Sequence, residues 1–357
     1  MNTNSSISIA HTWLQRVPAS PDAYPQKLDL VRASILGIHF SEADYRAASF
    51  LDDRILGPST QGAWLAIERV VAAAQLVHEP RPLHFILHTG HVGSTLVSRL
   101  LDTSGAVLSL REPLPLRTLA EASDSLGLDE SLLSERQFEQ LLDTFARLWC
   151  RGYATTRCVV VKATSATARL APWLMRRHPS SRACYLTVRA EPYLATLLAG
   201  ANSAADLRGH GAERMRRLRR SVGAPMPPLH ALSPGELTAL SWLAESITRR
   251  AVMTQFNDRL LPLDFDEILE DVPSAMARVA AHFDLPSDAG WVTKAASAPE
   301  LTRYSKSPVH AYSPALRAQI LQQARTEHRT EIAKGLRWLE QLAEKESLVA
   351  DVLRTNA

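Results

Sequence analysis

The chain has 357 residues, of which 46% are hydrophobic and 22% are charged, so its composition is that of an ordinary globular protein. Its formal net charge of +3 is too small for a general binder of nucleic acid, and no apolar run reaches the 18 residues of a membrane-spanning helix. Its three cysteines lack CxxC spacing and its first residues do not resemble a signal peptide, so we expect reduced thiols in a cytoplasmic protein.

Residues 1–80 are predicted to form an N-terminal extension that is mainly helical. The stretch at 61–77 places aromatic and aliphatic residues, from Trp64 to Leu76, at spacings of three to five. This spacing indicates an amphipathic helix whose apolar side faces the core. The segment FLDDRIL at 50–56 holds a charged trio between apolar flanks, and we interpret it as a helix that contacts the core.

Residues 81–357 are predicted to form one α/β domain. Short, unbroken apolar runs are typical of strands that are buried on both faces. Such runs cover residues 83–88, 106–110, 158–162, 183–188 and 259–264. Helical stretches separate them at 94–102, 131–151, 168–178, 192–203 and 236–257, and a helical tail covers 313–350. The alternation predicts a P-loop-like, three-layer α/β/α fold with a parallel sheet.

The segment FILHTGHVGSTLVSRLLD, residues 85–102, passes from a predicted strand through a loop with two glycines into a predicted helix. The first N–H groups of such a helix have no partner in the helix and favour an anion. Gly90 and Gly93 permit a close approach of the backbone, and Ser94 and Thr95 add hydroxyl donors. The Walker A pattern needs a lysine before Ser94, which argues against an ordinary ATPase or GTPase. A tight turn that binds nothing is the alternative reading.

Charged residues stand at the ends of three predicted strands. Glu112 follows one strand, Lys162 ends the next, and Arg189 follows the third. Because the carboxyl ends of parallel strands meet at one edge of the sheet, these residues should face the crevice where ligands bind. Histidines near the loop lack the carboxylate or cysteine spacing of a metal site, so we expect no metal.

Four segments together resemble the sulfotransferase superfamily, whose donor is 3′-phosphoadenosine-5′-phosphosulfate (PAPS). HVGSTLVSRLLD at 91–102 is similar to the 5′-phosphosulfate loop of that family, and YLTVRAEPYLATLL at 185–198 to its 3′-phosphate segment. The stretch at 261–286 is similar to a later family helix, and YSKSPVHAYSP at 304–314 resembles the Ser-Lys lid over the donor. The spacing of the Glu112 segment most resembles the tyrosylprotein sulfotransferase branch.

The resemblance implies transfer of a sulfuryl group from PAPS to a hydroxyl or amine of an unidentified acceptor, leaving 3′-phosphoadenosine-5′-phosphate (PAP), without a metal. Glu112 would then be the base. The catalytic residues implied are Glu112, His91, Lys162 and Ser305. The residues implied in binding the donor are Gly90, His91, Val92, Gly93, Ser94, Thr95, Arg189, Thr196 and Lys306.

Two positions depart from the family pattern. His91 stands where the family has a lysine or arginine, and an imidazole is often uncharged near neutral pH. Leu197 stands where a serine is expected, and Thr196 is the nearest hydroxyl. These departures leave open a non-catalytic nucleotide-binding or regulatory module on the same fold, and a kinase-like phosphotransferase is a third reading. The five arginines of 214–221 form either a solvated helix face or a segment that captures an acidic acceptor or closes over the adenine nucleotide.

Overall fold

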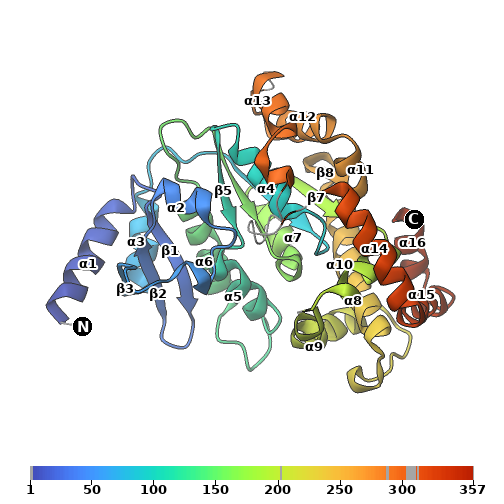
Figure 1. Cartoon of the computed structure of the whole chain (residues 1–357). Coiled ribbons are helices and arrows are strands. Elements are labelled where there is room, and N and C mark those ends of the chain that lie inside the picture. The colour runs from blue at the N-terminus through green and yellow to red at the C-terminus, as the bar shows by residue number, and fades with distance from the viewer. Residues whose placement is uncertain (1–2, 202, 287–288, 303–310, 312, 357) are drawn as a thin grey trace.

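The protein is described by a computed structural model, in which residues 3–201, 203–286, 289–302, 311 and 313–356 are placed. A five-stranded parallel sheet lies at its centre (Figure 1). The strands are β4 (Leu83–His88), β5 (Val107–Arg111), β6 (Cys158–Lys162), β7 (Ala183–Thr187) and β8 (Leu260–Asp264). Their order is β5-β6-β4-β7-β8, so the chain adds two strands on one side of β4 and then two on the other. A crevice for ligands forms at the carboxyl end of the sheet where such a reversal occurs.

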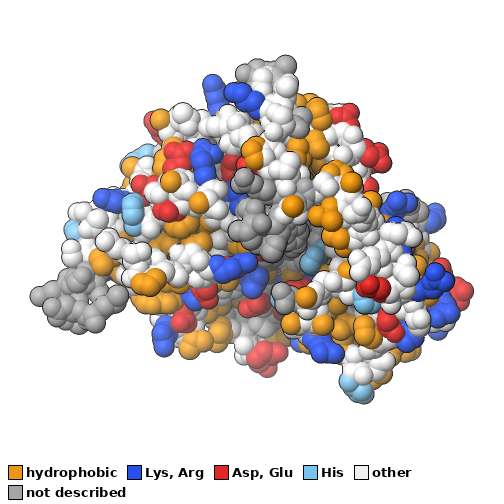
Figure 2. All heavy atoms as spheres, viewed as in Figure 1, with side chains coloured by type: hydrophobic (Ala, Val, Ile, Leu, Met, Phe, Trp, Pro, Cys, Tyr) orange, Lys and Arg blue, Asp and Glu red, His pale blue; other side chains and the backbone are white. Residues whose placement is uncertain are grey.

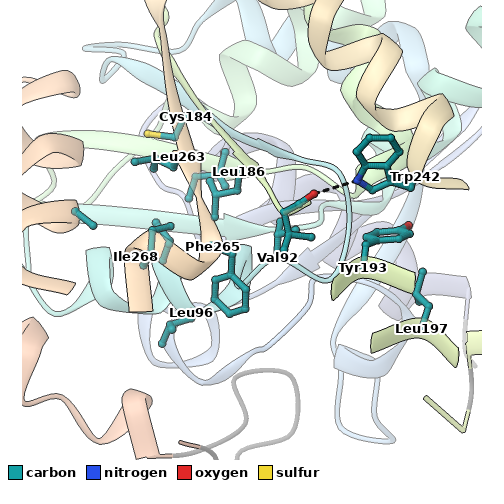
Figure 3. Packing of buried hydrophobic residues seen from close by; sticks show 14 of the residues in the cluster. Val92, Leu96, Cys184, Leu186, Tyr193, Leu197, Trp242, Leu263, Phe265 and Ile268 are labelled. Carbon is teal, nitrogen blue, oxygen red and sulfur yellow. Dashed lines mark hydrogen bonds between the residues drawn. The ribbon is translucent and has the colours of Figure 1, made fainter. Parts of the chain in front are cut away.

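Helices cover both faces of this sheet. Between the strands lie α4 (Ser94–Asp102), α5 (Leu114–Ser123), α6 (Glu135–Trp149), α7 (Ala171–Arg177), α8 (Ala190–Ala199), α9 (Ser203–Ser221) and α10 (Pro234–Phe256). In β4, Ile86 packs into a core with α4, α8 and α10, whereas Phe85 and Leu87 pack into a second core with α5, α6 and α7. Part of the first core is drawn in Figure 3. The predicted three-layer α/β/α fold with a parallel sheet is therefore confirmed.

The chain after β8 is helical. It contains α11 (Phe265–Glu270), α12 (Val272–His282), α13 (Ala289–Ala296), α14 (Pro314–Glu327), α15 (Arg329–Ala343) and α16 (Ser347–Thr355). The predicted helical tail is thus three consecutive helices, which lie beside α8 and α10 (Figure 1). No helix within the described ranges has the length and apolar character needed to cross a membrane.

The N-terminal extension begins with a helix, but it is not mainly helical. Its elements are α1 (Thr3–Arg16), β1 (Ala23–Asp29), β2 (Ser34–His39), α2 (Glu42–Ala47), β3 (Gly62–Ala66) and α3 (Ile67–Gln75). Strands β1, β2 and β3 form an antiparallel sheet that the sequence analysis missed. The extension packs on the α5–α6 face of the central sheet (Figure 1).

The helix predicted for residues 61–77 is wrong in its first third. Residues up to Ala66 form β3, in which Ala63 and Leu65 are buried while Trp64 between them is 46% exposed. Alternation with a period of two is the mark of a strand with one solvated face. The helix that follows, α3, does not bury Leu76, which is 58% exposed. The predicted helical face thus combined apolar residues that belong partly to the strand β3 and partly to the helix α3.

Candidate functional site

A cleft of about 640 Å³ opens at the carboxyl end of the parallel sheet. The segments after β4, β5 and β6 all reach it, through Gly90 and His91, Glu112, and residues 164–167. Helices α5 and α9 and the loop after α5 supply most of the remaining lining. Acidic and basic side chains alternate over this face of the molecule (Figure 2), so no single charge dominates it. The position matches the crevice that the strand order predicts.

The loop between β4 and α4 holds several residues in the left-handed region of backbone conformation. The φ angles are +99° at Gly90, +55° at His91 and +68° at Gly93. A Cβ atom on Gly93 would overlap the ring of Phe265, which packs beneath the loop (Figure 3). Gly93 is therefore required both by its φ angle and by this close approach. Glu112 also has a positive φ, of +58°, so two non-glycine residues in this strained conformation line the cleft.

His88, at the end of β4, holds the loop in this shape. Its Nδ1 accepts a hydrogen bond from the N–H of Gly90 at 3.0 Å, which leaves the ring proton on Nε2. Nε2 lies 2.7 Å from the carbonyl oxygen of Ala163 and donates to it. The side chain is only 6% exposed and lines the cleft. His88 is one of the histidines near the loop, and its hydrogen bonds connect the loop to the end of β6.

The start of α4 presents hydrogen-bond donors. The first intrahelical bond runs from the N–H of Val97 to the carbonyl of Gly93 at 3.0 Å, so the preceding amides belong to the open first turn. Ser94 and Thr95 are buried, and Oγ1 of Thr95 has no hydrogen-bond partner in the described part of the chain. Val92 is fully buried in the core, so only its backbone can take part in binding (Figure 3). Donors at a helix N-terminus, with an unsatisfied buried hydroxyl, suit an oxyanion.

Glu112 and Lys162 form an ion pair beside the loop. Strands β5 and β6 are neighbours in which Arg111 is in register with Lys162, so the next residue, Glu112, lies beside the end of β6. The backbone N–H of Glu112 donates to the carbonyl of Lys162 at 2.7 Å, which fixes the turn. The side chain of Lys162 is fully buried and that of Glu112 is 14% exposed, on the cleft. The two residues that strand ends predicted are therefore brought together.

The predicted 3′-phosphate residues lie outside the cleft lining. Arg189 is exposed at the start of α8. The residue before it, Val188, follows β7, and its carbonyl accepts a hydrogen bond from Trp242 at 3.0 Å (Figure 3). Thr196 donates its hydroxyl to the carbonyl of Pro192 at 2.7 Å, within its own helix. Leu197 is buried in the core (Figure 3). Ser305 and Lys306 lie outside the described residues.

The arginine cluster of 214–221 is not a uniformly solvated face. Arg214 and Arg217 turn inward and donate to Glu245 of α10, with Nε of Arg214 at 3.2 Å and Nη2 of Arg217 at 3.0 Å from Oε1. Glu245 is fully buried, and Arg214 is 3% exposed. Burial acts to lower the pKa of Arg214, but the charge and hydrogen bond of Glu245, with smaller contributions from Tyr193 and Asp206, together raise that pKa. Two of the arginines therefore join α9 to α10, while Arg216 and Arg220 are exposed and line the cleft.

Further residues of the cleft were not predicted. Tyr193 lines it, and its hydroxyl lies 2.9 Å from Oγ of Ser241; burial raises the pKa of Tyr193 to about 12. Its position one helical turn after Arg189 was a signal that could have indicated it. His210 of α9 also faces the cleft, and burial lowers its pKa. Among the residues that the structure places, no three His, Cys, Asp or Glu side chains gather as a metal site would require.

Comparisons with known proteins give matches only among solved structures. No protein-family model matches the chain, and no curated protein matches it. The sulfotransferase domain from the curacin biosynthetic pathway aligns at 13% identity, over 74% of this chain and 99% of its own, with a TM-score of 0.40. Sulfotransferase STF9 from Mycobacterium avium aligns at 13% identity, over 92% and 96%, with a TM-score of 0.40. Retinol dehydratase in complex with retinol and PAP aligns at 13% identity, over 77% and 88%, with a TM-score of 0.31.

Proposed function

We propose that this protein transfers a sulfuryl group from PAPS to a hydroxyl or amine of an acceptor. The observation that carries the proposal is the ion pair between Glu112 and Lys162, which lies at the edge of the cleft beside the β4–α4 loop. A carboxylate can accept the proton of an acceptor, and an adjacent buried ammonium can offset developing negative charge. The β4–α4 loop beside this pair has the donors that suit an oxyanion, so a base, a cation and an anion site would lie together at the cleft.

The loop residues suit the 5′-phosphosulfate end of PAPS. The amides of the first turn of α4 and the hydroxyls of Ser94 and Thr95 are the donors that would hold it. Gly90 and Gly93 keep side chains away from the approach. No lysine is available in the loop for an ATP-type phosphate contact, and His91 takes the entry position. Arg189 is the cation that would pair with the 3′-phosphate from the exposed end of β7.

In this proposal PAPS supplies an activated sulfuryl group, and the residues of the chain manage proton and charge. Glu112 takes the acceptor proton onto its carboxylate as the acceptor oxygen or nitrogen bonds to sulfur. The bond from sulfur to the bridging oxygen breaks, and its electron pair leaves on the phosphate of PAP. Lys162 offsets this charge from its buried position beside Glu112. Ser305 and Lys306 are assigned to the leaving side by the family resemblance alone.

A second candidate is a nucleotide-binding module without catalysis. It is favoured by Leu197, which is buried in the core where the family pattern expects a serine, and by Thr196, whose hydroxyl is bonded within its own helix. Both observations weaken the 3′-phosphate site and leave the Glu112–Lys162 pair unchanged. The two candidates therefore differ in turnover, and both of them predict PAP binding.

Calorimetric titration with PAP, followed by an acceptor screen with ³⁵S-labelled PAPS, separates these candidates. We expect PAP to bind and label to pass to at least one acceptor. Binding without transfer to any acceptor would favour the module. Failure of millimolar PAP to bind, or a requirement for ATP and Mg²⁺, would contradict the donor assignment and favour the kinase-like reading.

A further inference from the structure

A segment of the N-terminal extension lies against the residue that precedes Glu112. The backbone N–H of Leu51 donates to the carbonyl of Arg111 at 2.7 Å. In return, Nη1 of Arg111 donates to the carbonyls of Tyr45 and Ala48, at 2.8 and 2.6 Å. Because Arg111 is only 1% exposed, these bonds are shielded from water. The chain after α2 is thus fixed to the end of β5, immediately before Glu112, the proposed base.

This anchored segment places an aromatic ring beside Lys162. The ammonium nitrogen of Lys162 lies 5.6 Å from the ring centroid of Phe50, within the range of a cation–π contact. The guanidinium of Arg54 lies 3.8 Å from the same centroid and is held by Asp52, with Nη2 to Oδ2 at 2.6 Å. Phe50 is 8% exposed, so its ring is largely shielded from water.

Charges around the Phe50 ring are balanced, but the balance depends on Glu112. Two cations, Lys162 and Arg54, face two carboxylates, Glu112 and Asp52. The hydrogen bonds that Arg54 donates to Asp52 raise the pKa of Arg54, and the charge of Glu112 adds to that effect. When Glu112 takes a proton from the acceptor, its negative charge is lost. The buried ammonium of Lys162 then keeps the ring as a partner within the protein while it offsets the charge on the leaving group.

A lysine side chain needs such a partner to act from a fixed position. Its four-carbon stem has about 2 kcal/mol of rotamer entropy to lose when it is held in one orientation. The ionic attraction of Glu112 for Lys162 is lost when Glu112 becomes neutral in the proposed reaction. An aromatic face attracts the ammonium in both protonation states of Glu112, because the attraction comes from the ring quadrupole.

We propose that Phe50 is a positioning residue for Lys162, so that the N-terminal extension completes the active site. The catalytic part of this inference rests on the proposed sulfuryl transfer, whereas the positioning of Lys162 can be measured without turnover. The segment 50–56, predicted only to contact the core, thereby gains a role at the cleft.

The first test measures protection of Lys162 directly. The full-length protein is treated with an amine-acetylating reagent, and modification of Lys162 is followed by mass spectrometry. We expect no modification in the wild type or in Phe50→Tyr, which keeps the ring, and clear modification in the folded fraction of Phe50→Ala. Equal protection of Lys162 in all three proteins would overturn the proposal.

The second test uses turnover and a matched control. Phe50→Leu keeps an apolar side chain but removes the ring face, and we expect kcat to fall about 2- to 30-fold with the KM for PAPS nearly unchanged. Phe50→Tyr should restore kcat. The control is Phe40→Leu, since Phe40 is 6% exposed, belongs to the core of the N-terminal extension, and its ring contacts the rings of Tyr24 and Tyr45.

Comparing the kcat of Phe50→Leu with that of Phe40→Leu separates a specific role of the Phe50 ring from a general effect on packing. If Phe40→Leu lowers kcat as much as Phe50→Leu at equal melting temperature, Phe50 has only a structural role and the proposal is wrong. If the wild type transfers sulfuryl groups to no acceptor, the proposed function fails. The acetylation pattern then still decides whether the Phe50 ring holds Lys162 in place.

Discussion

Glu245 gives the sharpest stability prediction for this fold. It is fully buried in α10 and accepts hydrogen bonds from Arg214 and Arg217, both of which come from α9. Glu245→Gln keeps the shape of the side chain and removes the buried charge that both guanidinium groups contact. Removing one partner of a buried ion pair leaves uncompensated charge in the interior and costs about 3–5 kcal/mol. We therefore expect the free energy of unfolding to fall by about that amount.

The loss can be measured as a shift in melting temperature. For a chain of this length the entropy of unfolding is about 0.75 kcal/mol per kelvin, so the expected fall is about 4–7 °C at pH 7. The matched control is Glu344→Gln, because Glu344 is exposed and has no ion pair among the described residues. Calorimetric melting that gives the same Tm for both variants would refute the assignment of Glu245 as the centre of the network.

The same network predicts a dependence on pH. Burial by itself raises the pKa of Glu245, but Arg217 and Arg214 outweigh it and hold that pKa below its usual value. A lowered pKa in the folded state means that the stabilisation is complete above the unfolded pKa of about 4.3. It is lost as the pH falls through the lower folded pKa. The Tm difference between wild type and Glu245→Gln should therefore narrow below about pH 4, and a constant difference down to pH 3 would contradict this reasoning.

Three further predictions concern the cleft. Glu112→Gln should lower turnover about 10²- to 10⁴-fold with PAP affinity nearly unchanged by calorimetry, and lost affinity would indicate a structural role. Gly93→Ala should lower stability by about 1–3 kcal/mol and abolish PAP binding, because the added Cβ meets Phe265 and the φ of +68° is strained; unchanged melting would exclude this packing. His91→Arg should strengthen PAP binding at pH 8, where imidazole carries little charge, and equal affinity would show that His91 does not contact the phosphate.

The central sheet could be predicted because its strands are buried on both faces. Such strands appear in the sequence as unbroken apolar runs, and all five observed strands lie within one residue of the predicted ends. The extension gave no such signal, since β3 exposes Trp64 and is followed at once by α3. β3 joins α3 without a turn residue between them, so the two-residue period of the strand runs directly into the 3.6-residue period of the helix. The boundary at Ala66 therefore could not be identified from the spacing of the apolar residues.

The site was predictable only where its residues follow neighbouring parallel strands, which end at the same edge of the sheet. Glu112 and Lys162 come together because parallel strands end at one edge, and this can be expected from the strand order alone. Phe50 reaches Lys162 from a loop of the N-terminal extension, and Glu245 meets Arg214 through the packing of two consecutive helices, α9 and α10. Contacts of this kind depend on how segments pack, and no local pattern in the sequence encodes them.

Two clusters of residues, each built around a buried charge, therefore lie on different sides of the cleft. On one side, the extension contributes Phe50 to the group that contains Lys162 and Glu112. On the other, Glu245 fixes α9, whose outer arginines line the cleft. The first group lies where proton transfer would occur, whereas the second determines the shape of the wall that an acceptor would meet. If the protein transfers sulfuryl groups as proposed, its acceptor would meet the exposed arginines of α9 that line the cleft, which belong to a different cluster from Glu112 and Lys162. We therefore expect substitutions of these arginines to change the choice of acceptor while leaving the Glu112–Lys162 pair in place.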